Sequence, residues 1–146
     1  MNMRFENKDT FFVSGFSVET ANGETLEKDC TILKEKYEDI LRSVSSCLYY
    51  LIWSPKGYES DDLVCHLGIE SNDPLFAAEG ATSIELPAAC YVVATVPEGA
   101  SIIDMWQDFY AKGIPSLGVE IDLNYNIHFE YYDENGVCEL WVPVKA

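Results

Sequence analysis

Basic residues are scarce in this sequence: nine Lys and Arg stand against 25 Asp and Glu, which gives a formal net charge of −16. Contacts with phosphates depend on Lys and Arg, so the deficit argues against direct nucleic-acid binding and against an anionic membrane surface. The same negative potential would attract a cationic ligand. A simpler alternative is that the acidic surface only keeps the protein dispersed in solution.

Long apolar segments are also lacking. No apolar run approaches the ~20 residues of a membrane helix, and residues 1–8 contain no apolar stretch of the kind found in a signal peptide. The five cysteines are scattered, odd in number and without a Cys-x-x-Cys pair. Free thiols of this kind are typical of a reducing compartment, so we expect a cytoplasmic protein with no membrane partner.

Motifs that hold metals, cofactors or phosphates are missing as well. His66 and His128 are the only histidines, and no Cys, Asp or Glu set with ligand spacing accompanies them. We therefore expect no zinc site and no cofactor, with haem ligation by one of these histidines as the alternative. There is no Gly-rich phosphate loop and no nucleophile elbow.

The remaining composition is that of a globular protein. The 146 residues are 48% hydrophobic, which suits one domain (residues 1–146) with a real core. Nine Tyr, seven Phe and three Trp make up 13% of the chain, so rings can line a site as well as fill a core.

Two amphipathic helices are predicted, over about residues 25–44 and 101–112. Thr25 and Ser101 are suitable N-caps, and Gly113 and Pro115 should stop the second helix. Apolar residues recur at steps of three and four in both segments. The resulting stripes are Cys30, Leu33, Tyr37, Ile40, Leu41 and Val44 in the first helix, and Ile102, Met105, Trp106, Phe109 and Tyr110 in the second.

Strand-like segments rich in β-branched and aromatic residues surround these helices. They cover residues 10–18, 47–53, 63–70, 84–96, 127–132 and 137–144, with a connector over 71–83. Two halves, about 1–71 and 84–146, therefore follow the order strand, helix, strand, strand. We predict an α+β fold with antiparallel sheets, helices on one face, a pseudo-twofold relation between the repeats, and a ligand groove between the halves.

The last two strands form a hairpin around Asn135-Gly136, a strong signal for a two-residue loop. Such a loop places Glu130 opposite Trp141. A shift of one residue would instead place Glu130 opposite Leu140 and mix the two faces of the hairpin.

The first register separates the hairpin into two faces and is the one we predict. Phe129 opposes Val142 and Tyr131 opposes Leu140 on an apolar face, while Glu130 lies between aromatic rings on the other. A carboxylate in that setting is either a solvated surface group or the acidic group of an aromatic-lined site.

Five segments resemble motifs of one superfamily, in the right order and over almost the whole chain. They are residues 12–16 (Phe-Val-Ser-Gly-Phe), 86–91 (Leu-Pro-Ala-Ala-Cys-Tyr), 113–118 (Gly-Ile-Pro-Ser-Leu-Gly), 129–132 (Phe-Glu-Tyr-Tyr) and 141–144 (Trp-Val-Pro-Val). The chain resembles the GyrI-like effector-binding domain, the ligand-binding half of AraC-type and MerR-type multidrug regulators, which also occurs as stand-alone proteins.

The resemblance implies the duplicated fold described above and a ligand groove between the repeats. Relatives bind bulky, often cationic aromatic compounds, and the glutamate at the Glu130 position contacts the positive charge. Some stand-alone members hydrolyse cyclopropane-bearing compounds, a few bind gyrase, and distant relatives bind haem. No helix-turn-helix segment accompanies this domain, so we expect any regulatory role to need a separate regulator protein.

The resemblance and the aromatic pattern together select the candidate site. The residues predicted to contact a ligand are Glu130, Trp141, Tyr132, Tyr91, Trp106, Tyr110, Tyr49 and Trp53. By spacing alone Trp106 and Tyr110 are typical of a helix core, and Tyr49, Trp53 and Tyr91 fit packing as well as pocket lining. His128 shares a strand face with Glu130 and is a candidate supporting partner.

Three functions remain open. The first is a module that senses or sequesters a small aromatic, cationic molecule, with Glu130 as charge partner and Trp141 as the best cation–π surface. The second is a hydrolase in the same groove, in which Glu130 is the general base and Tyr132 donates a proton. The third is an acidic protein-interaction partner such as a gyrase inhibitor. A desolvated carboxylate among rings serves the first two equally well.

Overall fold

The structure is a computed structural model that describes residues 1–20, 26–54, 62–71, 80–125 and 127–145. Eight strands form one antiparallel sheet in the order β1-β6-β8-β7-β3-β4-β2-β5. The strands are β1 (Met3–Lys8), β2 (Phe11–Thr20), β3 (Leu48–Trp53), β4 (Leu63–Ser71), β5 (Thr82–Leu86), β6 (Ala89–Thr95), β7 (His128–Tyr132) and β8 (Cys138–Val144).

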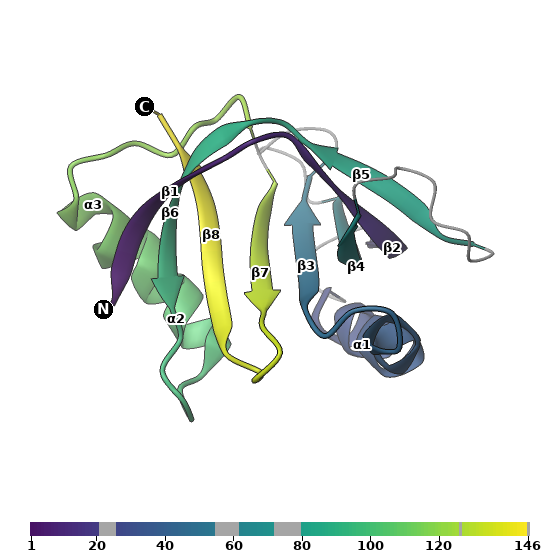
Figure 1. The fold of residues 1–146 in the computed structure, drawn as a ribbon. Coiled ribbons are helices and arrows are strands. Elements are labelled where there is room, and N and C mark those ends of the chain that lie inside the picture. Colours follow the sequence, from purple (N-terminus) through teal and green to yellow (C-terminus); the bar gives the residue numbers. More distant parts are fainter. Residues whose placement is uncertain (21–25, 55–61, 72–79, 126, 146) are drawn as a thin grey trace.

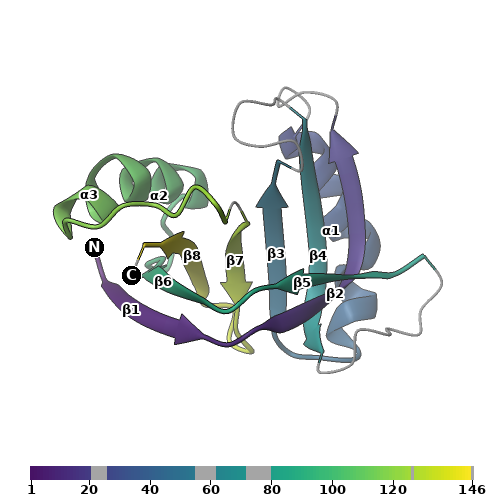
Figure 2. The ribbon, with the colours of Figure 1, turned by 90° about the horizontal axis from the view of Figure 1, so that it is seen from above.

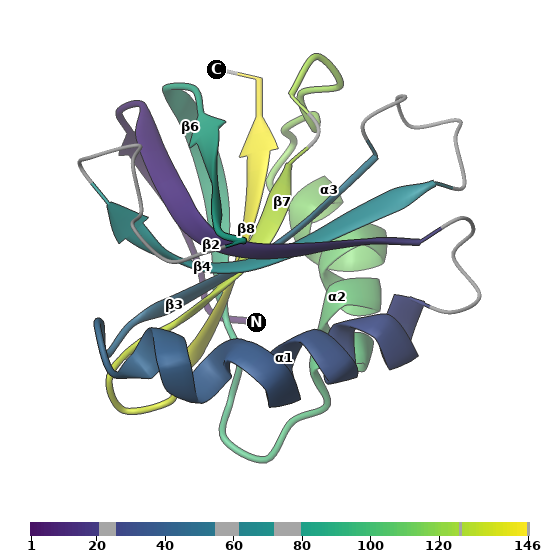
Figure 3. The same cartoon turned by 90° about the vertical axis from the view of Figure 1, so that its right-hand side faces the viewer.

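The helices lie on one side of this arched sheet (Figure 2). They are α1 (Leu26–Arg42), α2 (Ile102–Asp108), a π-turn η2 (Phe109–Gly113) and α3 (Ile114–Ser116). The helix α1 covers β3, β4 and β2, and α2 with η2 covers β6 and β8, because their apolar side chains join two buried clusters on that side. Figure 3 shows the same arrangement from the side, with α1 in front of α2. The predicted α+β class is confirmed.

The two halves have the same connectivity. In each, the chain runs strand, helix, strand, strand, and the strands are ordered β3-β4-β2 in one half and β7-β8-β6 in the other. The halves meet where β3 pairs with β7. Each half is preceded by a strand that pairs with the other half. The strand β1, before the first half, pairs with β6, and β5, before the second half, pairs with β2. The two strand pairs run together over the arch of the sheet (Figure 1). A twofold axis between the halves stays a prediction.

The second helix extends beyond its predicted end. Ser101 caps it as expected, by accepting a hydrogen bond from the Asp104 N–H. Gly113 and Pro115 do not stop it, because the backbone widens into a π-turn in which Ile114 N–H donates to the carbonyl of Phe109, five residues back. Proline is tolerated in the first turn of the short helix that follows.

The first helix is shorter than predicted. It ends at Arg42, and the stripe residues Ile40 and Val44 are 50% and 61% exposed, whereas Leu33 and Leu41 are buried. The cap predicted at Thr25 lies outside the described residues. No helix in the described part of the chain is long and apolar enough to cross a membrane.

Two strand predictions were wrong. Residues 84–96 form two strands, because the chain turns at Pro87-Ala88. The strand before the turn, β5, pairs with β2, and the strand after it, β6, pairs with β8. The N-terminal strand β1 was not predicted at all. Its residues alternate between charged and less polar side chains, and it is an edge strand with β6 on one side, so it has no apolar run to signal it.

The register predicted for the β7–β8 hairpin was also wrong. Glu130 pairs with Leu140, Phe129 with Trp141 rather than Val142, and Tyr131 with Glu139. The indole of Trp141 therefore lies on the face of the sheet opposite Glu130.

The cause of the shift is Asp133, which converts the predicted two-residue loop into a three-residue loop. Its backbone N–H donates to the Val137 carbonyl at 3.1 Å, and its Oδ1 accepts from the N–H groups of Asn135 and Val137 at 2.8 and 2.9 Å. Gly136 has a positive φ of 79° but Asn135 does not. A two-residue type I′ turn needs positive φ at both positions, so it does not form.

Candidate functional site

The site lies on the helix side of the sheet, where the two halves meet. Glu130 on β7 is only 5% exposed, although it is a carboxylate. It accepts two hydrogen bonds: Trp106 Nε1 donates to Oε2 at 2.7 Å, and the Tyr132 hydroxyl donates to Oε1 at 2.5 Å. Hydrogen bonds to a carboxylate are short and strong, and they offset part of the cost of burying it.

Tyr132 marks the junction between the two halves. Its ring packs against both the apolar cluster under α1 and the cluster under α2. Burial and the negative charge of Glu130 raise the pKa of the Tyr132 hydroxyl above its ordinary value, so this hydroxyl stays protonated and donates to the carboxylate.

Two cavities meet at Tyr132. One, of about 170 Å³, lies between α1 and the sheet and is lined in part by Lys34, Glu38 and Leu67. The other, of about 400 Å³, lies between the start of α2 and the β7–β8 loop. Together they have the size of a small-molecule site. Tyr132 lines both, so the two cavities adjoin at this one ring.

A lysine from α1 lies on the aromatic floor. Lys34 Nζ is 4.6 Å from the ring centroid of Tyr50 and 5.6 Å from that of Tyr132. Tyr50 is paired with Glu130 across β3 and β7 and is buried on the same face. The Lys34 ammonium therefore lies over two tyrosine rings, which is the geometry of a cation–π interaction.

The α2 side of the site is held by a chain of polar and aromatic contacts. Tyr110 stacks on Trp106 with centroids 5.4 Å apart, and its hydroxyl shares a 2.5 Å hydrogen bond with His128 Nδ1. Burial lowers the pKa of His128 to about 4, so this imidazole is neutral at neutral pH. These contacts fix the indole that donates to Glu130.

The predicted site residues divide between the two faces of the sheet. Glu130, Tyr132, Trp106 and Tyr110 come together on the helix side. Four others belong to the apolar cluster on the opposite side: Tyr49, Trp53, Tyr91 and Trp141. The placement of Trp141 beside Glu130 was wrong, and the indole that contacts this carboxylate is Trp106.

Sequence reasoning missed Lys34 and Tyr50. Lys34 follows the buried Leu33 in the helix and lies outside the predicted apolar stripe, but its long stem lets the ammonium reach the rings. Tyr50 follows the predicted residue Tyr49, and alternation along the strand sends the two rings to opposite faces. That alternation was the signal that could have found it.

The ring nitrogens of His66 are both engaged in hydrogen bonds. His66 is fully buried, with Nε2 bonded to the Val13 carbonyl at 3.0 Å and Nδ1 to the Ser17 hydroxyl at 2.6 Å. Since a carbonyl only accepts, Nε2 carries the proton and Nδ1 accepts from Ser17. Within the described ranges, no three His, Cys, Asp or Glu side chains gather in a way that could hold a metal ion.

Comparison of the sequence with protein families gives a match over most of the chain. The profile of the Cass2 family, described as integron-associated effector binding protein, matches residues 4–144. A comparison with the curated proteins finds no match.

Solved structures with the same fold cover nearly the whole chain. An integron cassette protein of Vibrio cholerae has a TM-score of 0.72 at 19% identity, covering 98% of this chain and 95% of its own. SAV2435 bound to tetraphenylphosphonium has a TM-score of 0.74 at 14% identity, with coverages of 100% and 95%. A protein of Staphylococcus aureus MU50, described as a putative bacterial transcription regulation protein, has the same TM-score and identity, with coverages of 100% and 99%.

Proposed function

Because this chain belongs to the Cass2 family of integron-associated effector binding proteins, we propose that it is a small-molecule binding module for bulky aromatic cations. The ligand lies in the groove between α1 and α2, with its positive charge against Glu130. Membership of the family confirms the resemblance to effector-binding domains that the sequence motifs indicated. The position of the ligand and its chemical class are the proposal.

The observation that carries this proposal is the state of Glu130. The carboxylate is 5% exposed, and both hydrogen bonds described for it come from neutral groups, the indole of Trp106 and the hydroxyl of Tyr132. The ion pairs found among the described residues do not include it. A buried negative charge held only by neutral donors gains most from a cationic partner.

The surroundings favour an aromatic cation over a small ion. Tyr50, Tyr132 and Trp106 offer ring surfaces around the carboxylate, and Lys34 already occupies the cation position above two of them. A ligand that carries its charge on an aromatic body would displace this ammonium and stack on the same rings. Tetraphenylphosphonium, which the structure of SAV2435 contains, is a compound of this kind.

The test is calorimetric titration with tetraphenylphosphonium. Glu130→Gln keeps the shape of the side chain and removes its charge, so affinity should fall by about 1–3 kcal/mol, the scale of an interaction with a charged group. Glu120→Gln is the matched control, because it removes one exposed charge that pairs with Lys145 at 3.4 Å. Its affinity should match that of the wild type.

A neutral ligand of similar shape completes the experiment. Triphenylphosphine oxide should bind wild type and Glu130→Gln about equally, because it has no charge to lose. If tetraphenylphosphonium also binds the two proteins equally, Glu130 is not the charge partner and the proposal is wrong. Hydrolysis in the same groove and a gyrase-inhibitor role remain predictions from the sequence.

A further inference from the structure

Two buried thiols face each other between α1 and β4, and the proposed function does not use them. Cys30 on α1 and Cys65 on β4 have their Sγ atoms 2.8 Å apart, and both are free thiols. Two other hydrogen bonds to sulfur among the described residues, at Cys47 and Cys138, are longer, at 3.9 and 4.0 Å. A covalent S–S bond of about 2.05 Å is within reach of a small movement of either side chain.

The packing of the first helix on the sheet brings the two residues together. Cys30 lies on the buried stripe of α1 next to Leu33, and both belong to the apolar cluster beneath this helix. Cys65 belongs to the same cluster and lies within β4, where it pairs with Val18 of β2 and Ile52 of β3. A bond between the sulfurs would therefore join two elements that already touch, across 35 residues of chain, without a change of fold.

The two thiols differ in exposure and in protonation. Cys65 is fully buried whereas Cys30 is 9% exposed, so a small molecule in solution can touch only Cys30. The hydrogen bond from the Cys65 thiol lowers the pKa of Cys30 despite its burial. The Tyr50 hydroxyl and the positive charge of Lys34 act in the same direction, against a smaller effect of Glu130. The same contact and its own burial raise the pKa of Cys65, so Cys65 keeps the proton and Cys30 is the nucleophile.

A buried phenol supplies a further donor beside the sulfurs. Tyr50 is 3% exposed, and within the described part of the chain its hydroxyl forms no hydrogen bond of ordinary geometry. It lies close enough to Cys30 and Cys65 to affect the pKa of both thiols. Burial raises the pKa of this hydroxyl, so it stays a donor. An unpaired buried hydroxyl costs free energy, and a negative sulfur, or an oxygen bound to sulfur, would give it an acceptor.

We propose that Cys30 and Cys65 form a reversible redox site whose substrate is a hydroperoxide. Among the described residues, no group of three His, Cys, Asp or Glu side chains could hold a metal ion, so these thiols are not part of a metal site there.

The reaction has two steps. The Cys30 thiolate attacks the terminal oxygen of the hydroperoxide, the O–O bond breaks, and an alcohol leaves with the proton that Cys30 gave up. Cys30 is then a sulfenic acid, whose oxygen can accept from the Tyr50 hydroxyl. The Cys65 sulfur attacks the Cys30 sulfur, the S–O bond breaks, and the oxygen leaves as water with its own proton and that of Cys65. Two electrons pass from the thiols to the peroxide, and an external dithiol returns them by exchange.

The test treats the reduced wild-type protein with one equivalent of hydrogen peroxide and maps its peptides by mass spectrometry without reduction. The peptide that contains Cys30 should become linked to the one that contains Cys65, and dithiothreitol should separate them. The oxidised protein should also unfold at a higher urea concentration, because the link restricts the unfolded chain. Cys47 and Cys90 are internal controls, since both are more exposed than Cys30. The proposal is overturned if either of them is oxidised before Cys30, or if Cys30 is oxidised without becoming linked to Cys65.

Substitutions separate the roles of the two thiols. Cys65→Ser should leave Cys30 as a sulfenic acid, which dimedone traps. Cys138→Ser is the matched control, because it removes another buried thiol and should still allow the disulfide to form. Absence of the dimedone product in Cys65→Ser would contradict the assignment of Cys30 as the attacking group. Should Cys65→Ser fail to give the wild-type circular dichroism spectrum, the peptide map of the wild type alone decides.

A further variant tests the hydroxyl of Tyr50. Tyr50→Phe should slow the alkylation of Cys30 by iodoacetamide severalfold and move the midpoint of its pH profile upward, because the thiolate loses a donor. Tyr37→Phe, at a ring packed against the same apolar cluster, should change neither. If the two variants give the same rate and the same midpoint, the role of the Tyr50 hydroxyl is overturned.

Discussion

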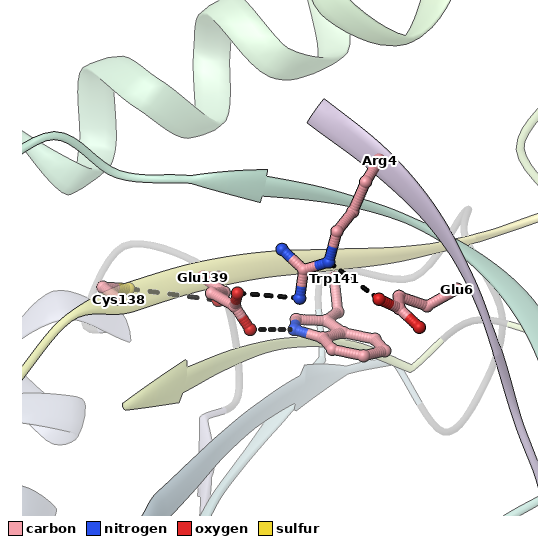
Figure 4. A network of polar contacts seen from close by, with 5 residues as sticks. All are labelled: Arg4, Glu6, Cys138, Glu139 and Trp141. Carbon is pink, nitrogen blue, oxygen red and sulfur yellow. Dashed lines mark hydrogen bonds and ion pairs between the residues drawn. The ribbon is translucent and has the colours of Figure 1, made fainter. Parts of the chain in front are cut away.

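The two faces of the β7–β8 hairpin each hold a carboxylate next to a tryptophan, but they neutralise it in different ways. Glu130 is 5% exposed and receives hydrogen bonds from two neutral donors. The side chain of Glu139 is 18% exposed and is paired with the guanidinium of Arg4 as well as with the Trp141 indole (Figure 4). The same pair of residue types thus leaves an unbalanced charge on one face and a nearly balanced one on the other.

This difference changes what each face offers a cationic ligand. Where no internal cation is paired with the carboxylate, a large cationic ligand supplies the missing charge. Where Arg4 is already paired with the carboxylate, a cationic ligand has less to gain. Burial decides between the two cases, because a solvated ion pair is easily exchanged and a buried carboxylate is not.

The largest effect should come from removing the ring of Phe129, which supports Trp141 on the sheet face opposite the helices. Phe129 is 1% exposed and contacts the rings of Tyr49, Tyr91 and Trp141. Phe129→Ala should lower the free energy of unfolding by about 3–5 kcal/mol, as measured by urea denaturation. Phe5→Ala, at a ring that is 52% exposed, should cost no more than about 1 kcal/mol. Equal losses would show that the stack is not a core element.

The pH dependence separates the two histidines, one on each face. Burial lowers the pKa of both to about 4, from 6.5 in the unfolded chain. The unfolded state therefore binds a proton first, and stability falls as the pH drops from 6.5 to about 4 and then levels off. For the fully buried His66 the total loss is about 3 kcal/mol, and for the half-buried His128 it is smaller.

Urea denaturation at several pH values checks this sign. His66→Gln should lower stability at neutral pH but flatten its decline between pH 6.5 and 4 relative to the wild type. His128→Gln should flatten it less. A steeper decline in His66→Gln would contradict the assignment of a neutral, Nε2-protonated imidazole at this position.

The two tryptophans that donate to these carboxylates, Trp106 and Trp141, should contribute unequally to the free energy of unfolding. Trp106→Phe removes one of the two donors from the buried Glu130, so it should cost about 1–3 kcal/mol in the free energy of unfolding. Trp141→Phe leaves Glu139 paired with Arg4 and should lose less through its hydrogen bond. Combining Trp106→Phe with Glu130→Gln should restore part of the loss, because no buried charge remains. Additive losses in this double variant would contradict the idea that Glu130 is a costly buried charge.

The smallest expected effect concerns the internal cation of the groove. Lys34→Met should raise the affinity for tetraphenylphosphonium by about 0.5–1 kcal/mol, because the ligand no longer has to displace an ammonium from the rings of Tyr50 and Tyr132. Lys36→Met on the same helix removes an equal charge above Tyr37 and should have no such effect. Calorimetric titration distinguishes the two, and equal affinities would show that Lys34 does not compete.

Much of the site could be predicted from local sequence. Alternation along β7 places Glu130 and Tyr132 on one face, and the helical spacing of Trp106 and Tyr110 places those two rings on one side of the second helix. Both inferences depend only on the period of a strand or a helix, which the backbone imposes whatever lies around it. The strand, helix, strand, strand order within each half and the effector-binding resemblance likewise follow from the chain alone.

The partner of Glu130 was decided by tertiary structure. Asn135-Gly136 is a strong two-residue turn signal, but the Asp133 carboxylate holds two backbone N–H groups and lengthens the loop by one residue. Because strand side chains alternate, that one residue moves Trp141 to the opposite face. Trp106, distant in sequence, takes its place beside the carboxylate when α2 packs on the sheet.

The edge strand β1 is a second feature that local sequence could not predict. The local sequence of β1 carries Arg4, Glu6 and Lys8 at alternate positions and has no apolar run to mark it as a strand. It becomes one because β6 offers a row of unpaired backbone groups, and this pairing brings Arg4 to Glu139 and Trp141. Local periodicity therefore determined which side chains share a face of a strand or helix. Pairing between distant segments decided which of these faces meet. The reason is that backbone hydrogen bonds between strands depend on which strand lies alongside, and that strand is seldom the neighbour in sequence.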